Sequence, residues 1–273
     1  MLPLTVIKPS HGWFRLDLGA LWQCRELLYF LVWRDVKVRY QQTLLGVAWA
    51  FLGPLFTLFI LTVVFGTLAR IPSDGLPYAV FAFAGFLPWN YFSQALTRAA
   101  GSLVGNAHLI TKVYFPRLAI PVSAVITPAT DFLFSLLAML GLMIWYRIAP
   151  GWGTLLVPLV VIFAGVTALA VALWLAPINA RFRDVGHTLP FLVQCWMYAS
   201  PVVYPLSLVP ERWRVLYSLN PMVSVIEGFR WALLGAPAPD PRVVLTGVVT
   251  VLILLLTGAA FFGRMQATLA DVV

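Results

Sequence analysis

Long apolar runs, separated by short polar segments, dominate the pattern of hydrophobic and polar positions along the chain. A helix needs about 20 mostly apolar residues to cross roughly 30 Å of hydrocarbon. The pattern therefore predicts an all-α integral membrane protein. Its six transmembrane helices are expected at residues 47–69, 78–97, 122–145, 155–177, 186–204 and 243–262, and together they form one transmembrane domain over residues 47–273.

Composition and charge agree with this pattern. Of the 273 residues, 61% are hydrophobic and 10% are charged, and the mean hydropathy is +0.91. Soluble domains carry roughly 45–50% apolar and about 25% charged residues, so the soluble globular class is excluded. Cys24 and Cys195 stand far apart in the sequence, which indicates neither a disulfide framework nor a zinc site.

The net charge of +8 favours a cytoplasmic membrane face over a nucleic-acid site in so apolar a chain. With the amino terminus inside, about two thirds of the lysines and arginines fall on the cytoplasmic side, as the positive-inside rule expects. The sequence therefore predicts that both termini are cytoplasmic.

The segment at residues 1–46 precedes the first apolar run and carries many charges. Helical spacing places its aromatic residues on one face, and Asp35 is spaced for an i,i+4 ion pair with Arg39. The segment predicts a helix that lies in the cytoplasmic interface, although a tail that merely stiffens on the headgroups is the alternative. The residues expected to make this helix interfacial are Trp22, Tyr29, Trp33, Arg34, Lys37, Arg39 and Tyr40.

The connection between the second and third predicted spans, residues 98–118, is expected to face the cytoplasm. Asn106 is suited to cap a short helix, and Pro116 is suited to end it. Aromatic and basic side chains are the residues that protein contacts favour. The run of Tyr114 and Phe115, next to Lys112, therefore predicts a docking surface.

The connection at residues 205–242 is too long for a structureless loop in a compact protein. It contains two apolar pieces, separated at Asn220, that are too short to cross the bilayer. We expect a re-entrant pair of helices there. Glu227 and Arg230 in the second piece are expected to face protein or water rather than lipid.

Motifs for chemistry are missing from the sequence. No phosphate-binding GxxxxGK[ST] loop, HExxH or GxSxG is present, so neither ATP binding in a P-loop of this chain nor catalysis by a metal or a serine nucleophile is expected. Asp131 is a single acid inside a predicted span. It indicates either a functional site or a structural hydrogen bond to a neighbouring helix.

Five short stretches, in order along residues 20–262, resemble the permease subunits of type-2 ATP-binding-cassette exporters. The resemblance is strongest to those that export lipid-linked polysaccharide, the O-antigen (Wzm-like) and teichoic-acid permeases. The stretches are residues 34–49, 87–93, 112–117, 179–185 and 220–230.

The resemblance implies a transport subunit of the bacterial cytoplasmic (inner) membrane. It would work with a second copy of itself and two nucleotide-binding ATPase subunits, which would hold ATP and magnesium, so that this chain needs no cofactor. The residues implied to couple it to the ATPase are His108, Lys112, Tyr114, Phe115, Arg117, Arg183 and Asp184.

A polysaccharide path needs stacking faces and polar edges, which Trp and Tyr side chains offer. The candidates are Trp89, Tyr91, Trp196, Tyr198 and Tyr204, although these residue types also gather at membrane interfaces for their amphipathic character alone. The rival function is export of a teichoic acid, a capsule or a small amphiphile by the same fold. A secondary transporter is disfavoured because Asp131 is the one acid in a predicted span, and a membrane-bound enzyme because the chain lacks a nucleophile–base or metal set.

Overall fold

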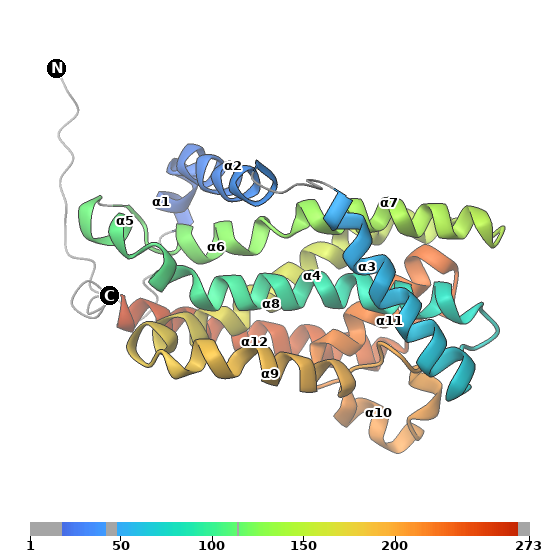
Figure 1. Ribbon diagram of the computed structural model, residues 1–273. Coiled ribbons are helices and arrows are strands. Elements are labelled where there is room, and N and C mark those ends of the chain that lie inside the picture. The colour runs from blue at the N-terminus through green and yellow to red at the C-terminus, as the bar shows by residue number, and fades with distance from the viewer. Residues whose placement is uncertain (1–17, 42–47, 114, 267–273) are drawn as a thin grey trace.

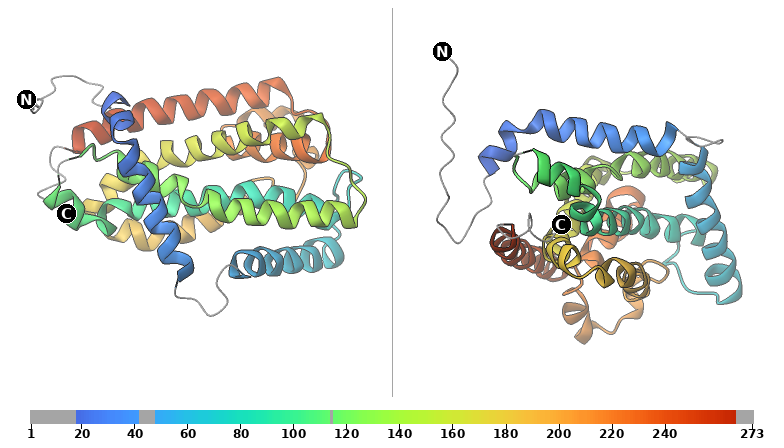
Figure 2. Two further views of the ribbon diagram at one scale, coloured as in Figure 1. Left: turned by 90° about the horizontal axis from the view of Figure 1, so that it is seen from above. Right: turned by 60° about the vertical axis from the view of Figure 1, so that its left-hand side comes forward.

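The computed structural model describes residues 18–41, 48–113 and 115–266, and every regular element in these ranges is a helix. The longer helices lie side by side along one common direction, and α2 crosses them near one end (Figures 1 and 2). We call this end, which carries α1, α2 and α5, the α5 end. The opposite end, which carries α10, is the α10 end.

The elements follow the chain with short connections. Their bounds are α1 Leu18–Gln23, α2 Arg25–Gln41, α3 Ala48–Leu61, the π-helix η1 Thr62–Leu68, α4 Tyr78–Gly105, α5 Ala107–Lys112, α6 Ala119–Ile126, α7 Ala129–Trp145, the 3-10 helix η2 Trp152–Leu156, α8 Val157–Arg181, α9 Asp184–Tyr198, the 3-10 helix η3 Leu206–Leu208, α10 Glu211–Tyr217, α11 Pro221–Leu234 and α12 Pro241–Met265.

Helix α4 forms the centre of the bundle and packs against α6, α7, α8 and α11. Most of its side chains are buried, among them Phe83, Phe92 and Leu96, which have no solvent exposure. Burial of side chains of this size stabilises the fold by about 1.5–3 kcal/mol each in water. Because lipid is as apolar as the core, close packing carries more of the stability in a membrane.

Four stretches of helix are long and apolar enough to cross a membrane. They are Phe51–Leu68, Ala119–Trp145, Trp152–Arg181 and Pro241–Met265, and they agree with the first, third, fourth and sixth predicted spans. Helix α4 has the required length, but Trp89, Asn90 and Gln94 lower its mean hydropathy. Helix α9 is shorter than the predicted fifth span.

Prolines explain the boundaries that differ from the predicted spans. The helix of the fifth span was expected to reach residue 204, but α9 ends at Tyr198, shortly before Pro201. Proline lacks an N–H group and its ring clashes with the carbonyl four residues earlier. The third span consists of two helices, α6 and α7, with Thr127 and Pro128 between them.

The outward faces of two long helices are apolar, as contact with lipid requires. Helix α12 exposes Leu245, Leu252, Ile253 and Leu256, and α7 exposes Leu133, Leu137 and Ile144. On its inner side α12 approaches α8 closely at Gly258, where an added Cβ would lie 2.9 Å from the carbonyl oxygen of Ala170. Small residues allow such close approach of helices in membranes.

Candidate functional site

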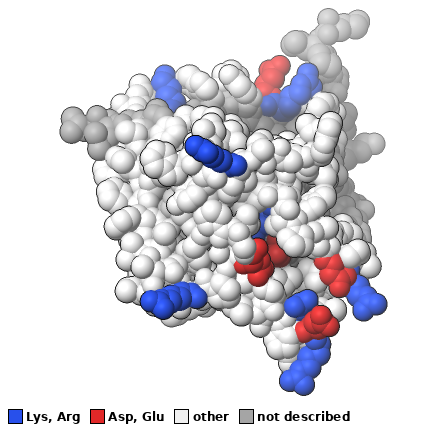
Figure 3. All heavy atoms as spheres, turned by 90° about the vertical axis from the view of Figure 1, so that its right-hand side faces the viewer, with Lys and Arg blue, Asp and Glu red and all other residues white. Residues whose placement is uncertain are grey.

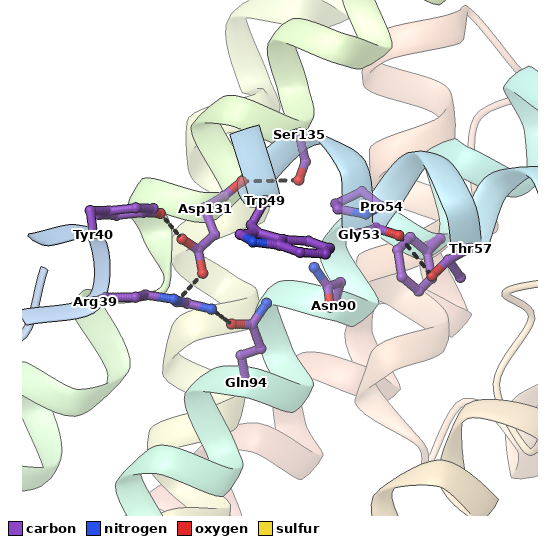
Figure 4. A pocket seen from close by; sticks show the side chains of 11 residues that line it. Arg39, Tyr40, Trp49, Gly53, Pro54, Thr57, Asn90, Gln94, Asp131 and Ser135 are labelled. Carbon is purple, nitrogen blue, oxygen red and sulfur yellow. Dashed lines mark hydrogen bonds and ion pairs between the residues drawn. The ribbon is translucent and has the colours of Figure 1, made fainter. Parts of the chain in front are cut away.

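The buried acid Asp131 lies in the first turn of α7 and is 5% exposed. The Tyr40 hydroxyl donates a hydrogen bond to Asp131 Oδ1, and Arg39 Nη1 forms an ion pair with Asp131 Oδ2. Arg39 Nη2 also donates to Gln94 Oε1 of α4 at 2.9 Å. This junction of α2, α4 and α7 is shown in Figure 4. Both oxygens of the carboxylate are therefore bound by the end of α2.

The electrostatics of the junction favour this pairing. A negative charge is stabilised in the first turn of a helix, where the backbone N–H groups point toward it. Burial raises the pKa of Tyr40 to about 12, and the hydrogen bond to Asp131 contributes to this shift. Tyr40 therefore keeps its proton and remains a donor to Asp131 over the physiological pH range.

A cavity of about 490 Å³ opens beside the junction. Trp49, Pro54 and Phe86 give it apolar and aromatic walls, and Asn90 and Gln94 give it amide groups. Figure 4 shows Trp49, Pro54, Asn90 and Gln94 around the same cavity as Arg39 and Asp131. A cavity with aromatic faces beside amides and an ion pair can hold a molecule that is both apolar and rich in hydrogen-bonding groups.

Helix α2 holds to the bundle through its polar side chains. Arg34 pairs with Asp35 at 2.8 Å and donates from Nη2 to Asn106 Oδ1 at 2.9 Å. The ion pair expected between Asp35 and Arg39 is therefore replaced by pairs with Arg34 and Asp131. Arg39 pairs with Asp131 rather than with Asp35 because Asp131 is buried, and opposite charges attract more strongly in a buried site than at the surface.

The aromatic residues of α2 do not all share one environment. Trp22, Tyr29 and Trp33 are exposed, and the Lys37 ammonium lies 4.6 Å from the centre of the Trp33 ring. Tyr40 instead turns toward Asp131. The exposed rings are available to a membrane surface, whereas Tyr40 serves the junction.

The predicted docking residues lie on α5 and on the segment that follows it, at one end of the bundle. His108 and Lys112 are exposed on it, whereas Phe115 is partly buried against a small apolar core that includes Leu118 and Phe262. Arg117 is half-buried, and its buried Nη1 has no hydrogen-bond partner within the part of the chain that the structure describes. Tyr114 lies outside the described residues.

Asn106 joins α5 to α4 in a different way from the cap that was expected. Its side chain does not cap α5 but donates from Nδ2 to the Ser102 carbonyl at 2.9 Å. Helix α5 ends at Lys112, before Pro116. Arg183 and Asp184, at the start of α9, are exposed at the same end of the bundle (Figure 1).

The aromatic candidates for a path fall into two groups. Trp89 and Tyr91 are buried, at 3% and 6% exposed, within the core around α4. Trp89 makes an edge contact with Trp196, and the Tyr91 hydroxyl donates to the Val125 carbonyl at 3.3 Å. Tyr198 is 52% exposed, and Tyr204 shares a hydrogen bond with Tyr217. A path-lining role for these side chains stays a prediction.

Asn220 divides the segment between α9 and α12 into two helices, α10 and α11, as the sequence indicates. Its Oδ1 accepts from Met222 N at 3.1 Å as the cap of α11, and from Trp196 Nε1 at 3.0 Å. Its Nδ2 donates to the Ala199 carbonyl at 3.1 Å. One side chain therefore satisfies both the start of α11 and the end of α9.

Arg230 of α11 is 1% exposed and lies inside the protein, away from lipid. It pairs with Glu227 at 2.9 Å, donates to the Val202 carbonyl at 2.8 Å, and stacks on Phe81 with 3.6 Å between its guanidinium carbon and the ring centre. Figure 3 faces the α10 end, where acidic and basic groups lie beside each other in the lower half of the face. This buried cation fixes α11 to α4.

Sequence reasoning missed the part that Gln94 takes in the junction. It named Arg39 and Asp131 separately, because nothing in their spacing indicates that they meet. The signal that could have found Gln94 is its amide inside an apolar run, since a polar group at membrane depth needs a partner.

Comparisons with known proteins agree with one another. Residues 26–234 match the family model described as ABC-2 type transporter. The chain is 33% identical to the O-antigen export system permease protein RfbA of Myxococcus xanthus, over 92% of this chain and 96% of that protein. It is 26% identical to the RfbA of Klebsiella pneumoniae, over 94% and 97%, and 25% identical to the polysialic acid transport protein KpsM of Escherichia coli, over 74% and 78%.

Proposed function

The chain belongs to the ABC-2 type transporter family, and from this membership we propose that it is the permease subunit of an exporter of lipid-linked polysaccharide of the O-antigen type. The observation that carries the proposal is the similarity over nearly the full length of two proteins named as O-antigen export permeases. A third relative is named for transport of polysialic acid, another polysaccharide.

The proposal includes a six-span arrangement in a bacterial inner membrane. The other two spans, besides the four apolar ones, are α4 and α9 together with the residues that follow α9. At about 1.5 Å per residue the 28 residues of α4 reach about 42 Å, enough to cross. Helix α1 and the last turn of α12 lie at the α5 end (Figure 1), which is cytoplasmic in this arrangement. Helix α2 crosses the long helices there and lies in the membrane interface.

Helices α10 and α11 form a re-entrant pair at the outer face. The 14 residues of α11 reach about 21 Å, less than the hydrocarbon thickness. Burial of Arg230 in protein supports this placement, because a cation in lipid is costly. The pair closes the outer end of the path.

The working unit contains a second copy of this chain and two ATPase subunits, which bind ATP and magnesium. The ATPase docks at the α5 end, against His108, Lys112, Phe115 and Arg117 and the nearby start of α9 with Arg183 and Asp184. The exposure of His108 and Lys112 supports this assignment. ATP binding shifts the two permease copies between closed and open arrangements by favouring one of them.

Depletion of the protein tests the proposal. Lipid-linked polysaccharide is located by surface labelling and by fractionation. The measurement is made in cells depleted of the protein and in depleted cells that are complemented with an intact copy of the gene. Polymer lost from the surface, with an internal pool that disappears on complementation, is the expected result. Normal surface polymer without an internal pool overturns the proposal and favours efflux of a small amphiphile.

A further inference from the structure

Between Asn90 and Gly101, the partly exposed face of α4 is mostly polar. Between Ala79 and Leu103, most residues of this helix are buried. The positions that are partly exposed follow the spacing of one helix face. They are Asn90, Ser93, Gln94, Thr97, Arg98 and Gly101. We call this set the polar strip.

The polar strip differs from the outward faces of the neighbouring long helices. The large exposed side chains of α12 and α7 are leucine, isoleucine, valine and tryptophan, as lipid contact requires. Unpaired amide and hydroxyl groups against lipid would each cost several kcal/mol. The polar strip therefore contacts something other than lipid.

Three cavities follow the polar strip and share its residues. The cavity of about 490 Å³ beside Asp131 and a second of about 470 Å³ between α4 and α9 share Phe86, Asn90 and Gln94. A third, of about 380 Å³, shares Thr97 and Arg98 with the second. It continues to Asn106 at the α5 end. From Phe86 to Asn106 the helix rises about 30 Å, which is the thickness of the hydrocarbon.

The polar groups of the strip have spare hydrogen-bonding capacity. Among the described residues, no side-chain hydrogen bond is found for Asn90 or Thr97, and Gln94 uses only its oxygen, toward Arg39. Aromatic faces lie beside these groups, at Trp49 and Phe86 in the first cavity and at Trp89 in the second. Amides and hydroxyls next to aromatic rings match a sugar, which has hydroxyls at its edges and C–H groups on its faces.

We propose that the polar strip of α4 binds the glycan part of the cargo as it crosses the membrane, with Asn90, Ser93, Gln94 and Thr97 exchanging hydrogen bonds with sugar hydroxyls. The inference rests on the proposed function and adds the binding surface to it. A second copy of the chain is a poorer occupant, because the strip is bordered by hollows over its length. A packed helix interface would fill such hollows.

Single cysteines test the occupant of the strip. In a background carrying Cys24→Ser and Cys195→Ser, Thr97→Cys is placed in the strip. Thr257→Cys on α12 is the matched control, because Thr257 is exposed among apolar side chains. Inverted membrane vesicles are treated with a charged methanethiosulfonate, once from cells that make the polymer and once from cells whose polymer synthesis is blocked.

The expected result has two parts. In vesicles without polymer, Thr97→Cys reacts about ten-fold or more faster than Thr257→Cys, because only a thiol in contact with water forms the reactive thiolate. In vesicles with polymer, the reaction at Thr97→Cys slows several-fold while the control is unchanged. Slow reaction at Thr97→Cys under both conditions would show a strip sealed by protein and overturn the proposal. Equal rates with and without polymer would overturn the glycan as occupant.

A second set of variants measures export directly. Asn90→Leu with Thr97→Val keeps the number and branching of the side-chain heavy atoms and removes the polar groups, so sugar hydroxyls that pass them lose water without gaining a partner. We expect surface polymer to fall about ten-fold or more, as two lost hydrogen bonds imply, while Thr257→Val leaves it unchanged. Normal export by the double variant would overturn the proposal that the polar strip binds the glycan. The depletion experiment alters no strip residue. Its failure would therefore overturn the proposed function, whereas normal export by the double variant would overturn only the role of the strip.

Discussion

Arg39, near the end of α2, forms an ion pair with Asp131, in the first turn of α7. The pair joins a helix that crosses the bundle at the α5 end to a helix that runs along it (Figure 2). Tyr40 and Gln94 add hydrogen bonds to the same two residues. Movement of α2 must therefore carry α7 and α4 with it or break the pair.

Asp131→Asn tests the strength of this junction. The variant leaves Arg39 facing a neutral amide in a mostly buried site, whose side chains are 31% and 7% exposed. We expect a loss of about 2–3 kcal/mol in the free energy of unfolding, since removal of one partner leaves an uncompensated charge. The measurement is unfolding of the purified protein in detergent.

A double variant and an exposed pair serve as controls for this prediction. Arg39→Gln combined with Asp131→Asn should lose less stability than the sum of the single variants, because the second change removes the unpaired charge. Glu211→Gln breaks a pair of 3.9 Å whose acid is 90% exposed, and it should change nothing measurable. Additive effects at Arg39 and Asp131 would contradict the pairing.

Arg230→Met should destabilise the α10 end. The variant leaves Glu227 without its partner and the Val202 carbonyl without its donor, which costs about 3 kcal/mol for a buried pair. Arg230→Lys should recover only part of the loss, because one ammonium cannot reproduce the planar contacts with both groups and Phe81. Arg212→Met, at an exposed position on α10, is the control. Full stability of Arg230→Lys would show that charge alone matters there.

The sequence is sufficient to predict most of the helices, but it does not predict which residues of different helices contact one another. Apolar length locates the four strongest spans, and Asn220 marks the division between α10 and α11, because caps and prolines act on their own neighbours. Pro201 also explains why α9 ends at Tyr198. Because this proline stands within an apolar run, the run alone predicts a longer helix. Arg39 and Asp131 lie in different helices, so no local rule brings them together. The polar strip is periodic in the sequence, but only its exposure shows that it faces outward.

Gly258→Ala should weaken the contact between α12 and α8. The added Cβ would meet the Ala170 carbonyl oxygen at 2.9 Å and the Trp174 ring at 2.9 Å, so the helices must separate, at about 1–3 kcal/mol. Gly141→Ala on α7 is the matched control, since nothing lies within 4 Å of its added Cβ. It should be neutral or stabilise the protein by up to about 1 kcal/mol. Thermal unfolding in detergent measures both, and equal effects would contradict the close approach.

The surface of α5 is the place where coupling to an ATPase is tested. Lys112→Glu reverses the charge of an exposed side chain at the end of α5, so folding should be unaffected. Charge reversal on a docking surface weakens association by placing a repulsive group at the interface. We expect normal membrane insertion, less ATPase recovered with the permease on purification, and reduced surface polymer.

Phe115→Ala and Arg117→Ala should abolish transport with normal insertion, because they remove the apolar and the cationic anchor beside α5. Phe115 also packs on the core near Leu118, so its variant needs a check of thermal stability, whereas Lys112→Glu separates docking from packing. Arg212→Glu reverses a charge at the α10 end and should leave ATPase recovery unchanged. Unchanged export by both Lys112→Glu and Arg117→Ala would contradict docking of the ATPase at α5. Arg183 and Asp184, which are also exposed at the α5 end and predicted to couple to the ATPase, would then be the residues to test.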